Sequence, residues 1–393
     1  MTPNGRGSTL RAMTMTDVDQ HLVETRTMWA DHIDAAGRDD AIAIVDDEVG
    51  NAWVTWRGDR LGMAEVQTPG ETDAIGERHA RARRGEPPAR RYDDALPRDH
   101  WDPDARIKSL DAMGIDTAVL FPNYGLLWER RLSVDLPAML ANMRAWNRWA
   151  AIVAGLSDRL APVAHLSLRD LDWLDAELAT IAAAGIRTAM IAPALVDGRP
   201  LSHPDLDPAW SAFTHHDIAP VFHVADQPRV FADGWYPPDG TDFVPVIDSV
   251  FLHTAAALAC TDLIVNGTLE RHGGLRIGIV ELSAVWVPMY LMMLDGGYDF
   301  TTRLNGSVPA PLSLRPSEYF ARQVRVSSFS YELPEHLRGQ LAGADLLMAC
   351  SDYPHSEGTA SPLADYAATG RYGIDPGRAP GLFHDNARFL LGR

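Results

Sequence analysis

Three short segments of the sequence carry side chains that can bind a metal ion together. Asp19 and His21 lie in the segment DVDQHLVE, His223 ends the apolar run PVFH, and Asp352 follows the apolar run LLMACS. Residues i and i+2 of a strand point to the same side, so Asp19 and His21 can reach one cation. Two imidazoles and two carboxylates suit a divalent ion that keeps an open position for water. We therefore expect these four residues to hold one divalent metal ion, Zn²⁺ with Mn²⁺ as the alternative.

Each of these segments also has an ordinary structural explanation when it is taken alone. Asp19-Gln20-His21 fits a capped turn after a strand, and His223 fits a hydrogen-bonded core histidine. Asp352 fits the N-cap of a helix. Their combination favours the metal site, because such an ion lowers the pKa of a bound water and polarises a substrate oxygen.

Further candidates could move protons or contact a substrate. Glu281 closes the apolar run Ile277–Val280 and is the first candidate acid or base, unless an arginine pins it as a structural carboxylate. His253, which opens a helix-like run, is the alternative catalytic residue, and His355 is expected to support a ligand or a loop. The candidate substrate-binding residues are His165, Arg229, Trp235, Tyr236 and Phe243.

Short apolar runs that alternate with helix-like segments predict the elements that position these residues. The expected strands are Met15–His21, Thr117–Pro122, Leu160–Leu168, Thr188–Ala194, Pro220–Val224, Arg276–Leu282, Gln323–Ser330 and Leu346–Ser351. Alternating β and α units imply a parallel sheet, and about eight of them favour a closed (β/α)8 TIM barrel. The rival is an open doubly wound sheet, which usually carries a glycine fingerprint that is absent here. Catalytic groups of a barrel project from the carboxyl ends of its strands, where the candidates lie.

The chain is longer than a minimal barrel of about 250 residues, so part of it must elaborate the fold. We expect a single α/β domain over residues 1–393, distorted by large insertions after strands 1 and 5, at about 28–101 and 225–252. The second insertion is expected to cover the metal site. Gly296–Pro316 is expected to be irregular. The basic stretch Arg78–Arg91 fits a solvated loop, an oligomer contact or a gate for an anionic substrate.

Composition excludes several classes of function. The chain has 35 Lys and Arg against 53 Asp and Glu, a net charge of −18, so it would repel a nucleic acid. Lys108 is the only lysine and follows Ile107, which excludes a phosphate-binding Gly-Lys-Ser/Thr loop. The cysteines, Cys260 and Cys350, are too few for a disulfide framework. Without a signal-like or membrane-length apolar segment, we expect a cytoplasmic protein with no membrane partner.

Several segments resemble the amidohydrolase superfamily, in the branch of aminocarboxymuconate-semialdehyde decarboxylase and the resorcylate decarboxylases. They are Asp17–Glu24 (DVDQHLVE), Asp104–Asn123 (DARIKSLDAMGIDTAVLFPN), Leu263–Pro288 (LIVNGTLERHGGLRIGIVELSAVWVP), Cys350–Gly358 (CSDYPHSEG) and His384–Ala387 (HDNA). The resemblance implies a distorted barrel with one divalent metal, and a homodimer as a family-level expectation. It also implies that Asp19, His21, His223 and Asp352 are the metal ligands.

Two residues depart from the pattern of many relatives. Asp19 stands where they carry the first histidine of a His-x-His pair, and Glu281 stands where they carry a catalytic histidine. A carboxylate can accept a proton or orient water, but it cannot carry positive charge as an imidazolium does. The expected function is therefore a metal-dependent hydrolase or non-oxidative decarboxylase acting on a small carboxylated or cyclic compound. The alternative is a barrel that binds a small ligand without turnover.

Overall fold

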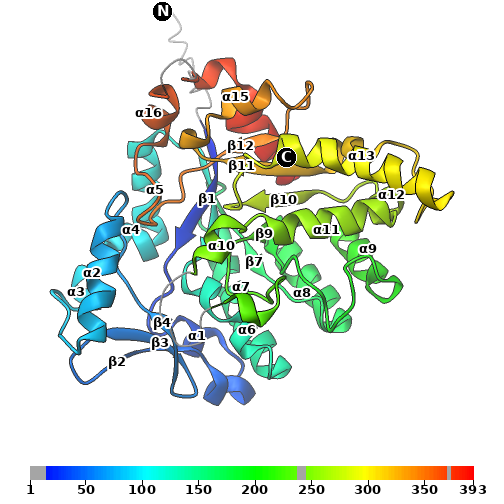
Figure 1. Ribbon diagram of the computed structural model, residues 1–393. Helices are drawn as coiled ribbons and strands as arrows, with labels where there is room; N and C mark the ends of the chain where they lie inside the picture. Colours follow the sequence, from blue (N-terminus) through cyan, green and yellow to red (C-terminus); the bar gives the residue numbers. More distant parts are fainter. Residues whose placement is uncertain (1–14, 237–244, 370–372) are drawn as a thin grey trace, which may run out of the picture.

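Parallel strands surround a central axis in the computed structural model, which describes residues 15–236, 245–369 and 373–393 (Figure 1). The strands are β1 (Thr16–Leu22), β5 (Thr117–Pro122), β6 (Leu160–Pro162), β7 (Ala164–His165), β8 (Thr188–Met190), β9 (Ala219–His223), β10 (Ile277–Val280), β11 (Val324–Ser328) and β12 (Leu347–Ala349). Only Val163 separates β6 from β7, so the two form one interrupted strand position. These nine strands thus occupy eight positions, and the expected (β/α)8 barrel is confirmed.

The barrel closes between the first strand and the segment that follows the last one. The strand order is β1-β5-β6 in one sheet and β7-β8-β9-β10-β11-β12 in the next, and all these pairings are parallel. At the seam, the Asp352 N–H donates to the Asp19 carbonyl at 2.8 Å, and the His21 N–H donates to the Tyr353 carbonyl at 2.7 Å. The seam therefore joins the two chain segments that carry three of the four expected metal ligands.

Helices cover the outside of the strands, and their ends follow from local sequence. The main ones are α5 (Pro103–Met113), α7 (Leu136–Ala154), α8 (Leu171–Ala183), α9 (Asp207–His215), α11 (Thr254–Val265), α13 (Val287–Asn305), α14 (Pro316–Gln323) and α17 (Asn386–Leu390). The Asp102 side chain caps α5 by accepting from the backbone N–H groups of Asp104 and Ala105, and Gly114 ends this helix at φ 75°. Trp146 fixes α7 to the barrel by donating its indole N–H to the Val163 carbonyl at 2.8 Å.

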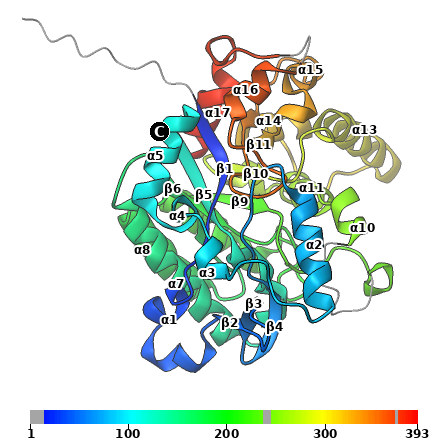
Figure 2. The same ribbon diagram turned by 90° about the vertical axis from the view of Figure 1, so that its left-hand side faces the viewer.

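The first insertion has secondary structure of its own. Between β1 and β5 lie an antiparallel sheet of β2 (Ala43–Asp46), β3 (Ala52–Trp56) and β4 (Asp59–Met63), and the short helices α1 (Met28–His32), α2 (Thr72–Arg83), α3 (Tyr92–Ala95) and α4 (Arg98–Trp101). Figure 2 shows α2 on the side of the molecule where α10 (Val246–Val250) of the second insertion lies, and residues of both helices line the same cavity. The two insertions therefore meet at one face of the barrel.

One expected irregular segment is largely helical. The expectation for Gly296–Pro316 is wrong for its first ten residues, because α13 continues through Gly296 and Gly297 to Asn305. Each glycine costs a helix only about 1 kcal/mol relative to alanine, so two of them do not stop a helix that is favoured on both sides. The helix ends at Gly306, whose φ of 68° suits glycine. Within the described ranges, no helix is both long enough and apolar enough to cross a membrane.

Candidate metal centre

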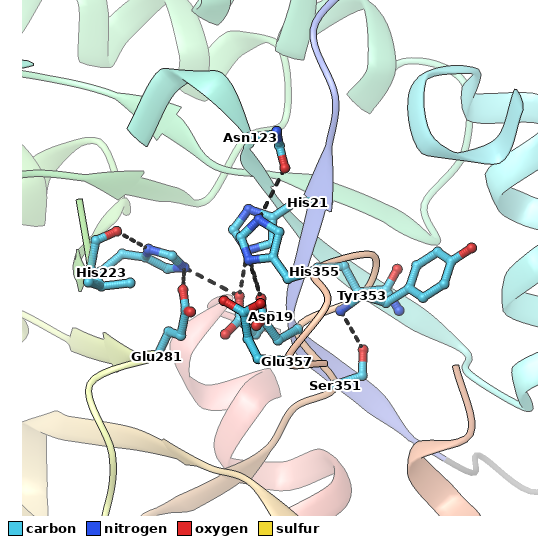
Figure 3. Close-up of polar contacts among 12 residues, drawn as sticks. Asp19, His21, Asn123, His223, Glu281, Ser351, Tyr353, His355 and Glu357 are labelled. Carbon is cyan, nitrogen blue, oxygen red and sulfur yellow. Dashed lines mark hydrogen bonds and ion pairs between the residues drawn. The ribbon is translucent and has the colours of Figure 1, made fainter. Parts of the chain in front are cut away.

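Six titratable side chains meet at the carboxyl ends of the barrel strands (Figure 3). They are Asp19 and His21 of β1, His223 at the end of β9, Glu281 directly after β10, and Asp352 and His355 after β12. In two overlapping groups of four, one ligand atom from each residue lies within 4.8 Å of the others. The structure therefore brings together the four expected metal ligands, and it adds Glu281 and His355 to them.

Both candidate ligand histidines are oriented by backbone carbonyl groups. His21 Nδ1 lies 3.0 Å from the Pro122 carbonyl oxygen, and His223 Nδ1 lies 2.8 Å from the Val224 carbonyl oxygen. A carbonyl oxygen can only accept, so Nδ1 carries the proton in both rings. In the neutral rings, the lone pair is then on Nε2. His21 Nε2 lies 3.1 Å from Asp352 Oδ1, and His223 Nε2 lies 3.3 Å from Asp19 Oδ1. Both lone pairs are thus aimed at the centre of the cluster.

The carboxylates of the cluster have oxygen atoms without partners. Asp19 Oδ2, Glu281 Oε2 and Asp352 Oδ2 are buried and accept no hydrogen bond from any residue in the described ranges, although Glu281 Oε2 lies 3.2 Å from His223 Nε2. Burying an unpaired carboxylate is costly, and buried charges are normally paired or coordinate a metal. Asp19 Oδ2 and Asp352 Oδ2, together with the two imidazole Nε2 atoms and the Glu281 carboxylate, form a donor set that fits a divalent cation.

The pKa values of the cluster reflect the same demand for positive charge. Burial alone would lower the pKa of His21, but hydrogen bonds to Asp19 and Asp352 raise it to about 10. Burial and the neighbouring charges of Asp352 and Asp19 raise the pKa of Glu281 well above its ordinary value. Burial opposes ionisation of Asp352, but His355 and His21 hold its pKa below the usual range. The negative charge of the carboxylates therefore favours protonation of the neighbouring groups. A bound cation would supply the same positive charge in place of a proton.

His355 contacts the candidate ligands directly. Its ring stacks on His21 with centroids 3.7 Å apart, and its Nδ1 lies 2.9 Å from Asp352 Oδ1. Its Nε2 lies 3.0 Å from Asn123 Oδ1. Asn123 is not among the residues predicted from the sequence, although it directly follows β5 and so lies at a strand end like the other candidates.

The backbone is unusual at two of the carboxylates. Glu281 and Asp352 have φ values of 54° and 58°, in the left-handed region that residues other than glycine rarely adopt. Such conformations persist where the surroundings hold them, and they cluster at functional sites. The Glu281 N–H donates to Ser327 Oγ at 3.0 Å, which fixes the start of this turn to β11.

Glu332 holds the rest of the turn that carries Glu281. Its carboxylate accepts from Ser283 Oγ at 2.5 Å, from the Ala284 N–H at 3.2 Å and from the Phe329 N–H at 3.0 Å. Ser283 also has a positive φ, 61°, so this carboxylate stabilises a strained segment. No sequence motif marks Glu332, because its role depends on a contact between two loops.

We expect Glu332→Gln to lower turnover by about 10-fold, because an amide keeps one acceptor oxygen and loses the other, which loosens the turn under Glu281. The KM and the bound metal should stay near wild-type values, since the residue touches neither substrate nor metal ligands. Steady-state kinetics and metal analysis check this, with the half-exposed Glu335→Gln as the matched control. An unchanged kcat would show that Glu332 does not position Glu281.

Three of the other candidates belong neither to the cluster nor to the lining of the cavity beside it. His253 stacks on Trp286 with centroids 5.5 Å apart, at the start of α11, and does not line the cavity beside the cluster. His165 is buried against Glu129, 3.2 Å from its Oε2, and also lies outside the cavity lining. Trp235 is 71% exposed and is not part of the lining either. An aromatic side chain in the second insertion is therefore not sufficient to predict that the residue lines the cavity.

A cavity of about 730 Å³ opens beside the cluster, and described residues of the second insertion contribute to its lining. His223, Glu281 and His355 line its inner end, whereas Arg229 and Tyr236 line it from the insertion. Phe243, another expected lining residue, lies outside the described residues. Asp19, His21 and Asp352 are not part of the lining, so they lie beneath the residues that face the cavity.

Comparisons with known proteins bear on the fold. No family model matches the sequence, and no curated protein matches it. A solved amidohydrolase from Mycobacterium avium subsp. paratuberculosis K-10 superposes with a TM-score of 0.76 at 23% identity, over 97% of this chain and 100% of that one.

Two solved decarboxylases are also similar in structure. The 5-carboxyvanillate decarboxylase of Novosphingobium aromaticivorans, complexed with manganese and 4-hydroxy-3-methoxy-5-nitrobenzoic acid, has a TM-score of 0.65 at 18% identity, over 97% of both chains. The 2,6-dihydroxybenzoate decarboxylase from Rhizobium has a TM-score of 0.58 at 18% identity, over 97% of this chain and 99% of that one. The resemblance inferred from the sequence motifs is thus confirmed at the level of the fold, and this chain has the barrel architecture of the amidohydrolase-type decarboxylases.

Proposed function

We propose that this protein is a metal-dependent decarboxylase of the amidohydrolase type that acts on a small carboxylated cyclic compound. The observation that carries this proposal is the buried donor set, two oriented imidazoles with unpartnered carboxylate oxygens, at the inner end of a cavity. The decarboxylases with the same fold support it, since one of them is complexed with manganese and a substituted benzoic acid. Asp19, His21, His223 and Asp352 would hold one divalent ion, Zn²⁺ or Mn²⁺.

The positions of the side chains indicate which residues would bind the metal ion and which would transfer protons. A bound divalent ion would polarise a substrate oxygen and neutralise charge that develops there. Glu281 and His355 face the cavity, so they can reach a substrate that Asp19 and Asp352 cannot. In its protonated form, Glu281 can donate its proton to the substrate ring carbon that carries the carboxylate group, while the bond between this carbon and the substrate carboxylate breaks. The bonding electrons stay on the carbon, carbon dioxide leaves, and the Glu281 carboxylate regains its proton from solvent.

Hydrolysis is the second candidate because Glu281 is a carboxylate at a position where many similar proteins carry histidine. An ionised Glu281 facing the cavity can accept a proton from water, as a hydrolytic base must. The two reactions differ in product, since only decarboxylation releases carbon dioxide. The third candidate function is binding of a small ligand without turnover. It predicts neither carbon dioxide nor a hydrolysis product.

The proposal also includes the cellular compartment and the oligomeric state of the protein. Cys260 and Cys350 are buried free thiols, which fits a reducing, cytoplasmic setting. The homodimer expected from the sequence resemblance stays a prediction, which light scattering of the purified protein tests.

We expect the purified protein to carry about one divalent ion per chain, and His223→Asn to remove most of it. Metal analysis by mass spectrometry measures the content, and carbon dioxide release from a panel of hydroxybenzoates measures the reaction. A chelator should abolish turnover, and added Mn²⁺ or Zn²⁺ should restore it. His216→Asn is the matched control, because His216 lies 2.9 Å from Asp175 away from the cluster. Equal metal content in the wild type and His223→Asn would contradict the proposed site.

A further inference from the structure

Two polar side chains of the first insertion line the cavity with hydrogen-bonding capacity that the protein itself does not use. They are Glu65 and Gln67, in the segment between β4 and α2. We propose that they bind a neutral hydrogen-bond donor, a hydroxyl or amino group, which the substrate carries in addition to the group at the metal. This inference rests on the proposed function, because it takes the metal end of the cavity as the reacting end.

The side-chain amide of Gln67 makes no hydrogen bond with any described residue. Its Oε1 is buried without a partner, and its Nε2 has none in the described ranges either. Buried polar groups are normally hydrogen-bonded, and leaving one unpaired is costly, so this amide needs an explanation. A turn about the last side-chain torsion exchanges the oxygen and the nitrogen. The amide can therefore offer an acceptor or a donor to a group in the cavity.

The carboxylate of Glu65 is held in place through one of its two oxygens. The side chain is only 7% exposed, and its Oε1 pairs with Nε2 of His79, which belongs to α2. Its Oε2 accepts no hydrogen bond from the part of the chain that the structure describes. A carboxylate offers acceptors only, so a group that binds to Oε2 must donate a hydrogen bond.

Polar contacts fix the segment of Glu65 and Gln67 at the inner end of the cavity. The Gly70 N–H donates to the Ser356 carbonyl at 2.7 Å, and Ser356 directly follows His355. The hydroxyl group of Tyr124, another lining residue, donates to the Glu65 carbonyl at 3.1 Å. The segment is thus joined to the loop that carries His355. Its side chains are held in position before a ligand arrives.

The two side chains together select the kind of group that they can bind. A hydroxyl group can donate to Glu65 and accept from Gln67, and an amino group can donate to both once the amide has turned. A methyl group of similar size can do neither and would leave both side chains unpaired. A carboxylate group offers no donor to Glu65. The pair therefore favours a neutral donor over an apolar or an anionic substituent.

The test uses Mn²⁺-loaded protein and 2-hydroxybenzoates that carry a hydroxyl, amino or methyl group at ring position 4 or 5. Hydroxymethyl and ethyl compounds extend the reach by one carbon. Calorimetry measures the affinity of each. We expect a hydroxyl or amino group to tighten binding by about 10-fold over its apolar counterpart at one position or more, as for a hydrogen bond to a charged group. A gain with only one of the two groups identifies that group. No gain above 2-fold in any pair overturns the inference.

Variants show whether the two side chains cause this gain. Gln67→Leu removes the amide at similar size, and Glu65→Gln replaces the charged acceptor with a neutral one, so each should reduce the gain at least 3-fold. Gln340→Leu is the matched control and should keep the full gain, because Gln340 is exposed and lies beside His336 at 2.9 Å. The thermal midpoint of each variant reports its folding. A gain that stays at the wild-type value in both Gln67→Leu and Glu65→Gln overturns the inference.

The apolar compounds separate this inference from the proposed function. Their binding depends on the metal end of the cavity and not on Glu65 or Gln67. If they bind and no donor group improves the affinity, only the inference fails. If no compound binds to the metal-loaded protein, the proposed function fails as well.

Discussion

Glu281→Gln is expected to retain the bound metal and to lose about 10²–10⁴-fold in turnover, the usual contribution of a general acid or base. The substitution keeps the shape of the side chain and removes its titrating proton. Glu281 lines the cavity, its Oε2 lies 3.2 Å from His223 Nε2, and its side chain is only 13% exposed. Steady-state kinetics and metal analysis of the same preparation give the two readouts.

The outcome also decides between the two catalytic candidates that the sequence offered. Full activity of Glu281→Gln with metal retained would move the role to His253, although His253 stacks on Trp286 outside the cavity lining. Loss of both metal and activity would instead make Glu281 a metal ligand, which its place in both groups of potential ligands allows. Glu335→Gln, at a half-exposed position, is the control for removing a carboxylate.

The sequence predicted the barrel, and it singled out four side chains that the structure places in one cluster, because both follow from local rules. Alternating apolar runs define parallel strands, and the carboxyl ends of such strands meet at one face of a barrel. The two-residue period of a strand placed Asp19 and His21 on one side, and both belong to the cluster although the pairing of β1 with β5 is irregular between Asp17 and Gln20. His223 and Asp352 could be predicted from their positions at strand ends alone.

The misses have a different physical origin. Trp235 and His253 belong to the second insertion and the segment after it, whose direction depends on tertiary packing rather than on a repeating pattern. Glu332 acts across two loops, and Arg106 lies in α5 and contacts β1 and Asp99 rather than the cluster. Long-range polar contacts of this kind leave no periodic signal, so the sequence indicated the residues that meet in the cluster but not most of those that hold them in place.

Arg106 is a buried charged residue whose loss should cost substantial stability. It is completely buried, and burial lowers the pKa of its guanidinium to about 10. Its three nitrogens donate to the Asp99 carbonyl at 2.8 Å, Gln20 Oε1 at 3.0 Å and the His21 carbonyl at 2.8 Å. Gln20 in turn donates to Asp17 Oδ2 at 2.8 Å. The network therefore ties α5 to the back of the strand that carries Asp19 and His21.

We expect Arg106→Met to lower the free energy of unfolding by about 3–5 kcal/mol, the range for removing one partner of a buried charged network. Methionine fills a similar volume but leaves three acceptor oxygens without a donor, and it leaves the buried Asp17 without its nearby positive charge. Urea denaturation of the metal-free protein measures the change apart from metal binding, with the exposed Arg199→Met as control. Arg106→Lys should recover only part of the loss, because one ammonium group cannot reach three acceptors in different directions. A loss below about 1 kcal/mol would show that the network contributes little to stability. If the loss is as large as expected, metal affinity should fall with it, since the same guanidinium holds the backbone of His21.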